Sequence, residues 1–116
     1  LGCAAANASL DLLEKSPHKY LDFESRHLPH LQKLVKDTRI ICPRITGTIA
    51  AFNIKVKGKK GYLSSVGKIM KANALKVGVF IRPLGDVVYL MPPLCITDEE
   101  LEKCYLGIQE GLNALS

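Results

Sequence analysis

The chain has 116 residues, of which 47% are hydrophobic and 23% charged, as in an ordinary globular domain with a buried core. No apolar run approaches the roughly 20 residues that span a bilayer, so we expect no membrane association. The net charge is +5, and four lysines fall within residues 55–61, "KVKGKKG". Such a loop is more often solvated than bound to phosphate, so we expect no nucleic-acid partner either.

The cysteines do not indicate a metal or redox site. Cys3, Cys42, Cys95 and Cys104 include no CxxC pair, so a zinc knuckle or a thioredoxin-type centre is not expected. Without paired spacing or a signal peptide, a reducing compartment is the default, and we expect a cytoplasmic protein.

The first half of the chain predicts two helices. Residues 2–15 are rich in alanine and leucine, and Pro17 ends the pattern. Residues 18–36 carry apolar side chains near helical spacing. Pro29 lies inside that second pattern, so we expect a kink or a local break there.

The period then changes to that of β-strands. Residues 39–57 are rich in β-branched side chains and end in an alternation that places Phe52, Ile54 and Val56 on one face. Gly47 predicts a bulge or a close approach within this stretch. A further helix is expected from about residue 64 to residue 75.

The last third predicts a hairpin and a final helix. Residues 77–91 hold two apolar runs around the turn residues 83–86, and a double proline ends the second run. Thr97 and Glu100 form a capping box at the start of the last helix. The buried stripe of this helix is expected to be Leu101, Tyr105, Ile108 and Leu112. The order predicts an α+β fold with a small, mainly antiparallel sheet covered by helices.

The chain contains no recognisable catalytic motif of its own. His27 and His30 have a spacing that metal ligands can use, but no acidic or thiol ligand is near them and Arg26 would repel a cation. We therefore interpret both as surface histidines. No nucleophile elbow and no nucleotide fingerprint is present, so we expect no catalytic residue and no metal in these residues.

Arg82 is the candidate binding residue. Its apolar neighbours predict an apolar setting, in which a guanidinium needs an anionic partner. That partner is either Asp86 across the turn, or water, or the carboxylate of a ligand gripped by the planar guanidinium. The residues alone leave these alternatives open.

Residues 82–102, "RPLGDVVYLMPPLCITDEELE", resemble the C-terminal segment of the class III, pyridoxal-phosphate (PLP)-dependent aminotransferases, and are most similar to the branch that acts in biotin biosynthesis. "LGCAAANASLDLLE" and "ITGTIAAFNI" resemble earlier segments of that family, in the same order. The matching positions in the first string are Arg82, Pro83, Gly85, Tyr89, Leu90, Met91, Pro92, Pro93, Ile96 and Thr97.

The resemblance implies a fold and a set of binding residues. Residues 1–15 would be a connecting helix, and residues 16–116 the C-terminal small domain of a fold-type I PLP-dependent transferase. Arg82 matches the arginine that binds the substrate carboxylate in this family, and Tyr89 matches a tyrosine of the same pocket. Leu84 stands where relatives often have a phenylalanine against the substrate, so the resemblance implies that Leu84 also binds the substrate and shapes the pocket.

The resemblance also implies a cofactor, two substrates and a second subunit, and it places the cofactor-binding residues outside this chain. The lysine that binds PLP and the aspartate that pairs with its ring nitrogen lie before residue 1 in the family, so these residues by themselves are expected to be inactive. The acceptor would be 8-amino-7-oxononanoate, the donor S-adenosylmethionine, and the parent enzyme a homodimer. The alternatives are another class III ω-aminotransferase, a binding module that uses residues 55–61, or a structural module of an assembly.

Overall fold

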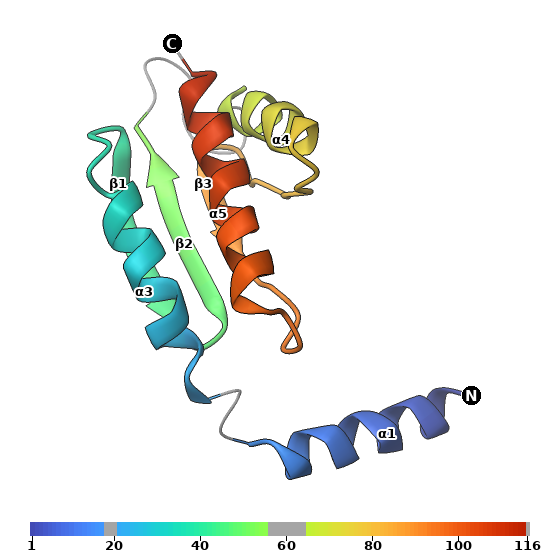
Figure 1. Cartoon of the computed structure of the whole chain (residues 1–116). Coiled ribbons are helices and arrows are strands. Elements are labelled where there is room, and N and C mark those ends of the chain that lie inside the picture. Colours follow the sequence, from blue (N-terminus) through green and yellow to red (C-terminus); the bar gives the residue numbers. More distant parts are fainter. Residues whose placement is uncertain (18–20, 56–64, 116) are drawn as a thin grey trace.

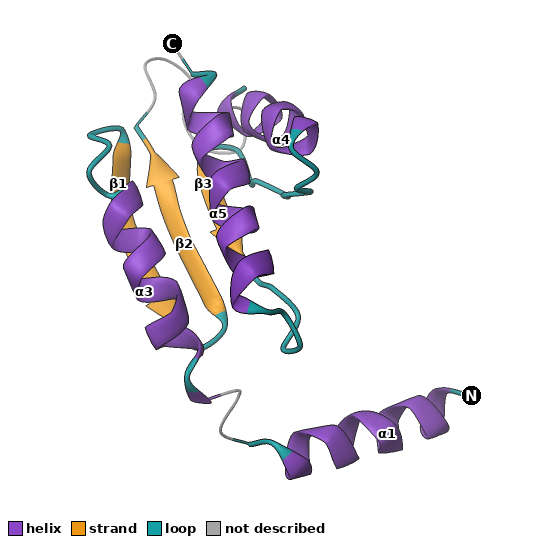
Figure 2. Ribbon diagram, in the orientation of Figure 1, coloured by secondary structure: helices purple, strands orange, loops and turns teal. Residues whose placement is uncertain are grey.

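The fold is a three-stranded antiparallel sheet covered by helices, as the sequence predicts (Figures 1 and 2). The computed structural model describes residues 1–17, 21–55 and 65–115. The strand order is β1-β2-β3. The described elements are α1 (Gly2–Lys15), α3 (Phe23–Leu34), β1 (Ile40–Thr46), β2 (Ile49–Ile54), α4 (Val66–Lys76), β3 (Val87–Leu90) and α5 (Asp98–Asn113).

Strands β1 and β2 form a hairpin, and its details correct the expectation for Gly47. This glycine lies in the turn between the strands, with a φ of 56° that favours glycine over residues with a side chain. The irregularity lies instead between Ile41 and Arg44, where Cys42 has a φ of 52°. The Arg44 guanidinium donates hydrogen bonds to the Cys42 carbonyl and to the Asn53 side chain, which stabilises the bulge.

The predicted hairpin at residues 77–91 is wrong in its first arm. β3 pairs with β2 along its length, and residues 79–82 form no strand. A single bridge, between Leu84 and Val87, closes the turn. The physical reason is that Val79 and Ile81 belong to the buried core, with Val79 packed against Gly107 of α5, so burial of apolar surface holds this segment in place of a ladder with β3.

One face of the sheet carries the core. α3 and α5 lie side by side over this face, and α4 packs on α5 (Figure 1). The predicted stripe of α5 is confirmed, because its four residues are all buried. The core cluster joins these helices to apolar side chains of all three strands, among them Ile40, Phe52, Ile54, Val88 and Leu90.

Two helices differ from the expectation. α3 begins at Phe23 rather than at residue 18, and residues 18–20 lie outside the described part. It continues through Pro29 without a break. Pro29 and Ser25, the residue four positions earlier, are both exposed, so the carbonyl that lacks a helical donor can bind water. Residue 64, the expected start of the next helix, and most of the lysine loop also lie outside the described residues.

α1 stands away from the rest of the chain (Figure 1). None of its side chains is buried, and Leu10 and Leu12 are exposed. The radius of gyration is 15.8 Å, against about 13 Å for a compact domain of this length.

Within the described residues, no helix is both long enough and apolar enough to cross a membrane.

His27 is a core residue, which corrects its interpretation as a surface histidine. Its side chain is 0% exposed. Nε2 lies 2.9 Å from the Thr48 carbonyl oxygen, which can only accept, so Nε2 carries the proton. Nδ1 therefore accepts from the Tyr105 hydroxyl at 2.7 Å. The two bonds join α3, the β1–β2 turn and α5 through a neutral imidazole.

Burial shifts the pKa of both members of the His27–Tyr105 hydrogen bond. Burial lowers the pKa of His27, and the nearby Arg26 and His30 act in the same direction against the hydrogen bond to Thr48. Burial also raises the pKa of Tyr105 above its ordinary value. Both shifts favour the neutral forms that the network needs.

Two glycines allow the helices to approach residues 79–85 closely. A Cβ added at Gly67 of α4 would lie 2.7 Å from the Gly85 carbonyl oxygen. A Cβ added at Gly107 of α5 would lie 2.6 Å from the Val79 Cβ. The segment that carries Arg82 is thus held at both ends by contacts that a side chain would disrupt.

Replacing Gly67 by alanine should destabilise the protein by about 1–2 kcal/mol, because overpacking against a backbone oxygen outweighs the gain in helix propensity. Gly2→Ala in α1 is the matched control, since nothing lies within 4 Å of its added Cβ. Urea unfolding of the two variants measures the difference. Equal midpoints would contradict the close approach.

Stability should fall with acidification because of His27. Its pKa is lowered on folding, so the unfolded chain binds the proton more readily. The contribution of His27 is complete above its ordinary value of 6.5 and is lost as the pH falls through the folded value. Urea unfolding of the protein and of His27→Gln between pH 8 and pH 5 should give the shallower slope for the variant. Its slope should not vanish, because the pKa of His30 is also lowered. Identical slopes would show that His27 does not titrate between the two states.

Candidate functional site

An apolar groove of about 350 Å³ contains two of the three predicted site residues. Arg82 and Tyr89 both line it, although they come from different elements. Leu84 does not line it and lies in the turn, 56% exposed. The other lining residues are Phe80, Ile81, Leu90, Met91, Pro92, Pro93, Ile96 and Cys104.

Arg82 is exposed, which corrects the expectation of a buried guanidinium. Within the described part of the chain it forms no ion pair, and Asp86 across the turn is not its partner. Its Cζ lies 5.4 Å from the centroid of the Phe80 ring. Because the guanidinium is in contact with water, it incurs no large burial penalty and stays available to an anion.

Strand β3 places Tyr89 in the same groove as this guanidinium. Tyr89 pairs with Ala51 of β2, and its neighbours Val88 and Leu90 point into the core. Alternation along the strand therefore turns Tyr89 to the opposite side. Its side chain is half-buried, and its hydroxyl adds a second polar group to the groove besides the Arg82 guanidinium.

The far wall of the groove is the loop between β3 and α5, which Arg26 of α3 holds. The Arg26 Nη2 donates to the Ile96 carbonyl at 2.7 Å, and Nε donates to Asp98 at 2.7 Å. The predicted capping box is confirmed, since Thr97 and Glu100 exchange both hydrogen bonds. The loop is thus fixed on both sides of Thr97, next to the two prolines that line the groove.

Sequence reasoning did not assign the other eight lining residues to the site, and three of them, Cys104, Met91 and Phe80, come from separate parts of the chain. Cys104 reaches the groove from α5, and burial raises the pKa of its thiol, so it is a neutral, apolar wall there. Met91 follows β3. Phe80 could have been found from the sequence, because it lies two residues before Arg82 and alternates with the buried Val79 and Ile81.

The groove is suited to a ligand with an apolar chain and an anionic end. Its lining is mostly aliphatic or aromatic carbon, and among the residues that the structure describes Arg82 is the one charged side chain in it. A guanidinium binds a carboxylate through two parallel hydrogen bonds. The arrangement can therefore bind and orient a carboxylate, and it offers no nucleophile that is activated for catalysis.

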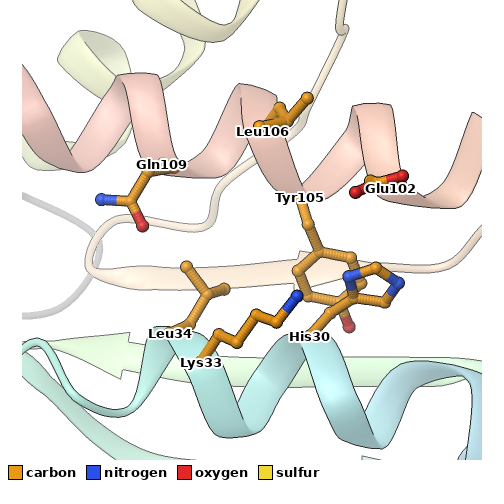
Figure 3. A pocket seen from close by; sticks show the side chains of 7 residues that line it. All are labelled: His30, Lys33, Leu34, Glu102, Tyr105, Leu106 and Gln109. Atoms are coloured by element: carbon orange, nitrogen blue, oxygen red, sulfur yellow. The ribbon is translucent and has the colours of Figure 1, made fainter.

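A second hollow, between α3 and α5, is less suited to a ligand (Figure 3). His30 stacks on Tyr105 there, with ring centroids 4.7 Å apart, and Lys33 and Glu102 lie at the rim. Burial lowers the pKa of His30. The hollow holds about 130 Å³, well below the roughly 300 Å³ at which ligand pockets begin. In the described part of the chain, no three His, Cys, Asp or Glu side chains gather as metal ligands would.

Comparison with known sequences places the chain in one family. Residues 1–112 match the family "Aminotransferase class-III". An adenosylmethionine-8-amino-7-oxononanoate aminotransferase of Synechococcus elongatus is 42% identical over 115 residues, which are 99% of this chain. The enzyme of the same name from Helicobacter pylori is 35% identical over 121 residues.

Solved structures show the same fold. An amine transaminase from an uncultivated Pseudomonas species, in a PLP-bound form, superposes with a TM-score of 0.81 and 25% identity over 98% of this chain. The omega transaminase of Pseudomonas jessenii, in complex with PMP, has a TM-score of 0.76 and 20% identity over 90% of this chain. The small α+β fold is therefore that of the corresponding part of PLP-dependent transaminases.

The match covers only part of each relative. The chain spans 27% of the two curated enzymes. It spans 27% and 24% of the two transaminase structures, respectively. The family match, in contrast, covers residues 1–112 of the 116 residues of this chain. This chain belongs to the class III aminotransferase family.

Proposed function

We propose that this chain is the C-terminal part of a PLP-dependent aminotransferase of biotin biosynthesis. The full protein would transfer an amino group from S-adenosylmethionine to 8-amino-7-oxononanoate and would act as a homodimer. In this chain, Arg82 binds the carboxylate of the acceptor. The observation that carries the proposal is the apolar groove with one unpaired guanidinium, in a chain of this family.

The chemistry of the acceptor fits the groove. 8-Amino-7-oxononanoate is a nine-carbon chain with a carboxylate at one end and the reacting keto group near the other. Arg82 can hold the carboxylate, and the methylene chain can lie on apolar walls such as Ile96 and Met91. Tyr89 also lines the groove. The named relatives at 42% and 35% identity favour this substrate over that of another ω-aminotransferase.

Leu84 fits this proposal only in part. Leu84 follows Arg82 by two residues and is expected from the resemblance to shape the pocket. Its side chain, however, is exposed and does not line the groove that the described residues form. We propose that it faces the substrate from the turn once the rest of the protein is present. The groove itself does not require it.

The residues of the groove do not fit PLP itself. PLP needs an amine for its aldehyde and a carboxylate for its ring nitrogen, and the lining contains neither lysine nor aspartate. We therefore propose that PLP is bound by residues outside this chain. The role of these residues is to bind and orient the substrate, and the chain alone would be inactive.

The distribution of buried side chains supports the proposed domain boundary between residues 15 and 16. α1, within residues 1–15, buries none of its side chains in this chain, whereas residues 21–55 and 65–115 share one core. We propose that α1 is a connecting helix that packs on the remainder of the protein, and that residues 16–116 form the small domain.

Arg82→Ala in the full-length enzyme should lower kcat/KM for 8-amino-7-oxononanoate about 10- to 100-fold, since a hydrogen-bonded charge pair is worth about 1.5–3 kcal/mol. The PLP absorbance should not change. The methyl ester of the acceptor lacks the charge, so the variant should use acid and ester almost equally whereas the parent prefers the acid.

Arg44→Ala is the matched control for this experiment. It removes an exposed arginine from β1 that does not line the groove. It should leave the preference for the acid unchanged. If Arg82→Ala also keeps that preference, Arg82 does not bind the carboxylate.

The proposed reaction is tested directly with the full-length enzyme. S-adenosylmethionine and 8-amino-7-oxononanoate should be consumed in equal amounts, and the product should be a diamine that mass spectrometry identifies. A simple ω-amine that replaces S-adenosylmethionine without loss of rate would favour the alternative ω-aminotransferase. No turnover of the oxo acid with any donor would refute the assignment to biotin biosynthesis.

A further inference from the structure

Phe80 is an exposed aromatic side chain whose ring contacts two cations. It is 56% exposed, although aromatic side chains of this size are usually buried. The Lys71 Nζ lies 4.8 Å and the Arg82 Cζ 5.4 Å from its ring centroid. Both distances are within the range of about 6 Å in which a ring face attracts a cation.

The backbone dictates that Phe80 and Arg82 share a side of their segment. Val79 and Ile81 are buried at 6% and 3% exposure, and Phe80 and Arg82, which alternate with them, are exposed. Val79 is held against Gly107, and its N–H donates to the Ala74 carbonyl at 3.0 Å. The backbone that carries the ring is therefore held in place, on the wall that also carries Arg82.

A free arginine side chain samples many rotamers, and ordering it opposes ligand binding. Among the described residues, the Phe80 ring is the partner that the structure gives to the Arg82 guanidinium, which has no ion pair there. A cation–π contact restricts the guanidinium without neutralising it. An acidic partner would restrict it too, but it would compete with the substrate carboxylate.

We propose that Phe80 is a positioning residue that holds the Arg82 guanidinium over the groove for the substrate carboxylate. The inference rests on the proposed function of Arg82 and goes beyond it by assigning a role to a neighbour. Lys71 contacts the same ring from α4 but does not line the groove, so it supports the ring and does not bind the ligand.

The test uses the full-length enzyme with Phe80→Leu, Phe80→Trp, Arg82→Ala and the double variant Phe80→Leu/Arg82→Ala. Phe80→Leu should raise the KM for 8-amino-7-oxononanoate roughly two- to fivefold, with kcat and the PLP absorbance unchanged. Phe80→Trp should keep KM within about twofold of the parent, because indole is the better cation partner. In the Arg82→Ala background, Phe80→Leu should have no further effect.

The outcomes separate the two claims. If Arg82→Ala leaves the kinetics of the acceptor unchanged, the proposed function of Arg82 fails, whatever Phe80 does. If Arg82→Ala impairs the enzyme but Phe80→Leu does not, the positioning role is overturned. The role is also overturned if Phe80→Leu is equally harmful with and without Arg82, or if Phe80→Trp is as harmful as Phe80→Leu.

Discussion

The close packing of residues 79–85 against two glycines is the constraint on which the groove depends. Gly107 admits the Val79 side chain and Gly67 admits the Gly85 carbonyl, each at a distance that a Cβ would not allow. Contacts this tight leave little freedom for the backbone between them, because protein interiors resist changes in volume. Arg82 lies in that stretch. Its direction is thus set by the packing of α4 and α5, and not by a strand ladder.

The four arginines of the described residues have different partners, and Arg44 donates to the Cys42 carbonyl and the Asn53 side chain. Arg26 pairs with Asp98 and holds the wall of the groove. Arg39 pairs with Asp37, whose pKa it lowers by hydrogen bonding, and donates to the carbonyls of Leu112 in α5 and of Leu115 just after it. Arg82 has an aromatic neighbour instead of an acidic one. A guanidinium without an acidic partner among the described residues is what the proposed role of Arg82 in carboxylate binding requires.

The core and the groove have separate supports. His27 ties α3 to α5 and to the β1–β2 turn through two buried hydrogen bonds, far in sequence from the residues it contacts. A buried imidazole without hydrogen-bond partners would lower the stability of the fold. The network therefore fixes the distance between α3 and α5, the two helices that cover the sheet. α1, in contrast, buries none of its side chains. Its exposed leucines agree with a chain that spans about a quarter of its relatives' length.

The sequence by itself determined the helices with clear end signals, the alternation of β2, the capping box at Thr97 and the buried stripe of α5, because these depend on local spacing and on caps. It also indicated Arg82 and Tyr89 as candidate site residues, because both lie in the sequence string that resembles the family. Only the tertiary structure decided that His27 is buried, since its partners Thr48 and Tyr105 are 21 and 78 residues away. The same holds for residues 79–82, whose apolar run suits a strand as well as a packed loop. Helix contacts formed around two glycines, and not a local preference, made that choice and left Phe80 and Arg82 on the open side.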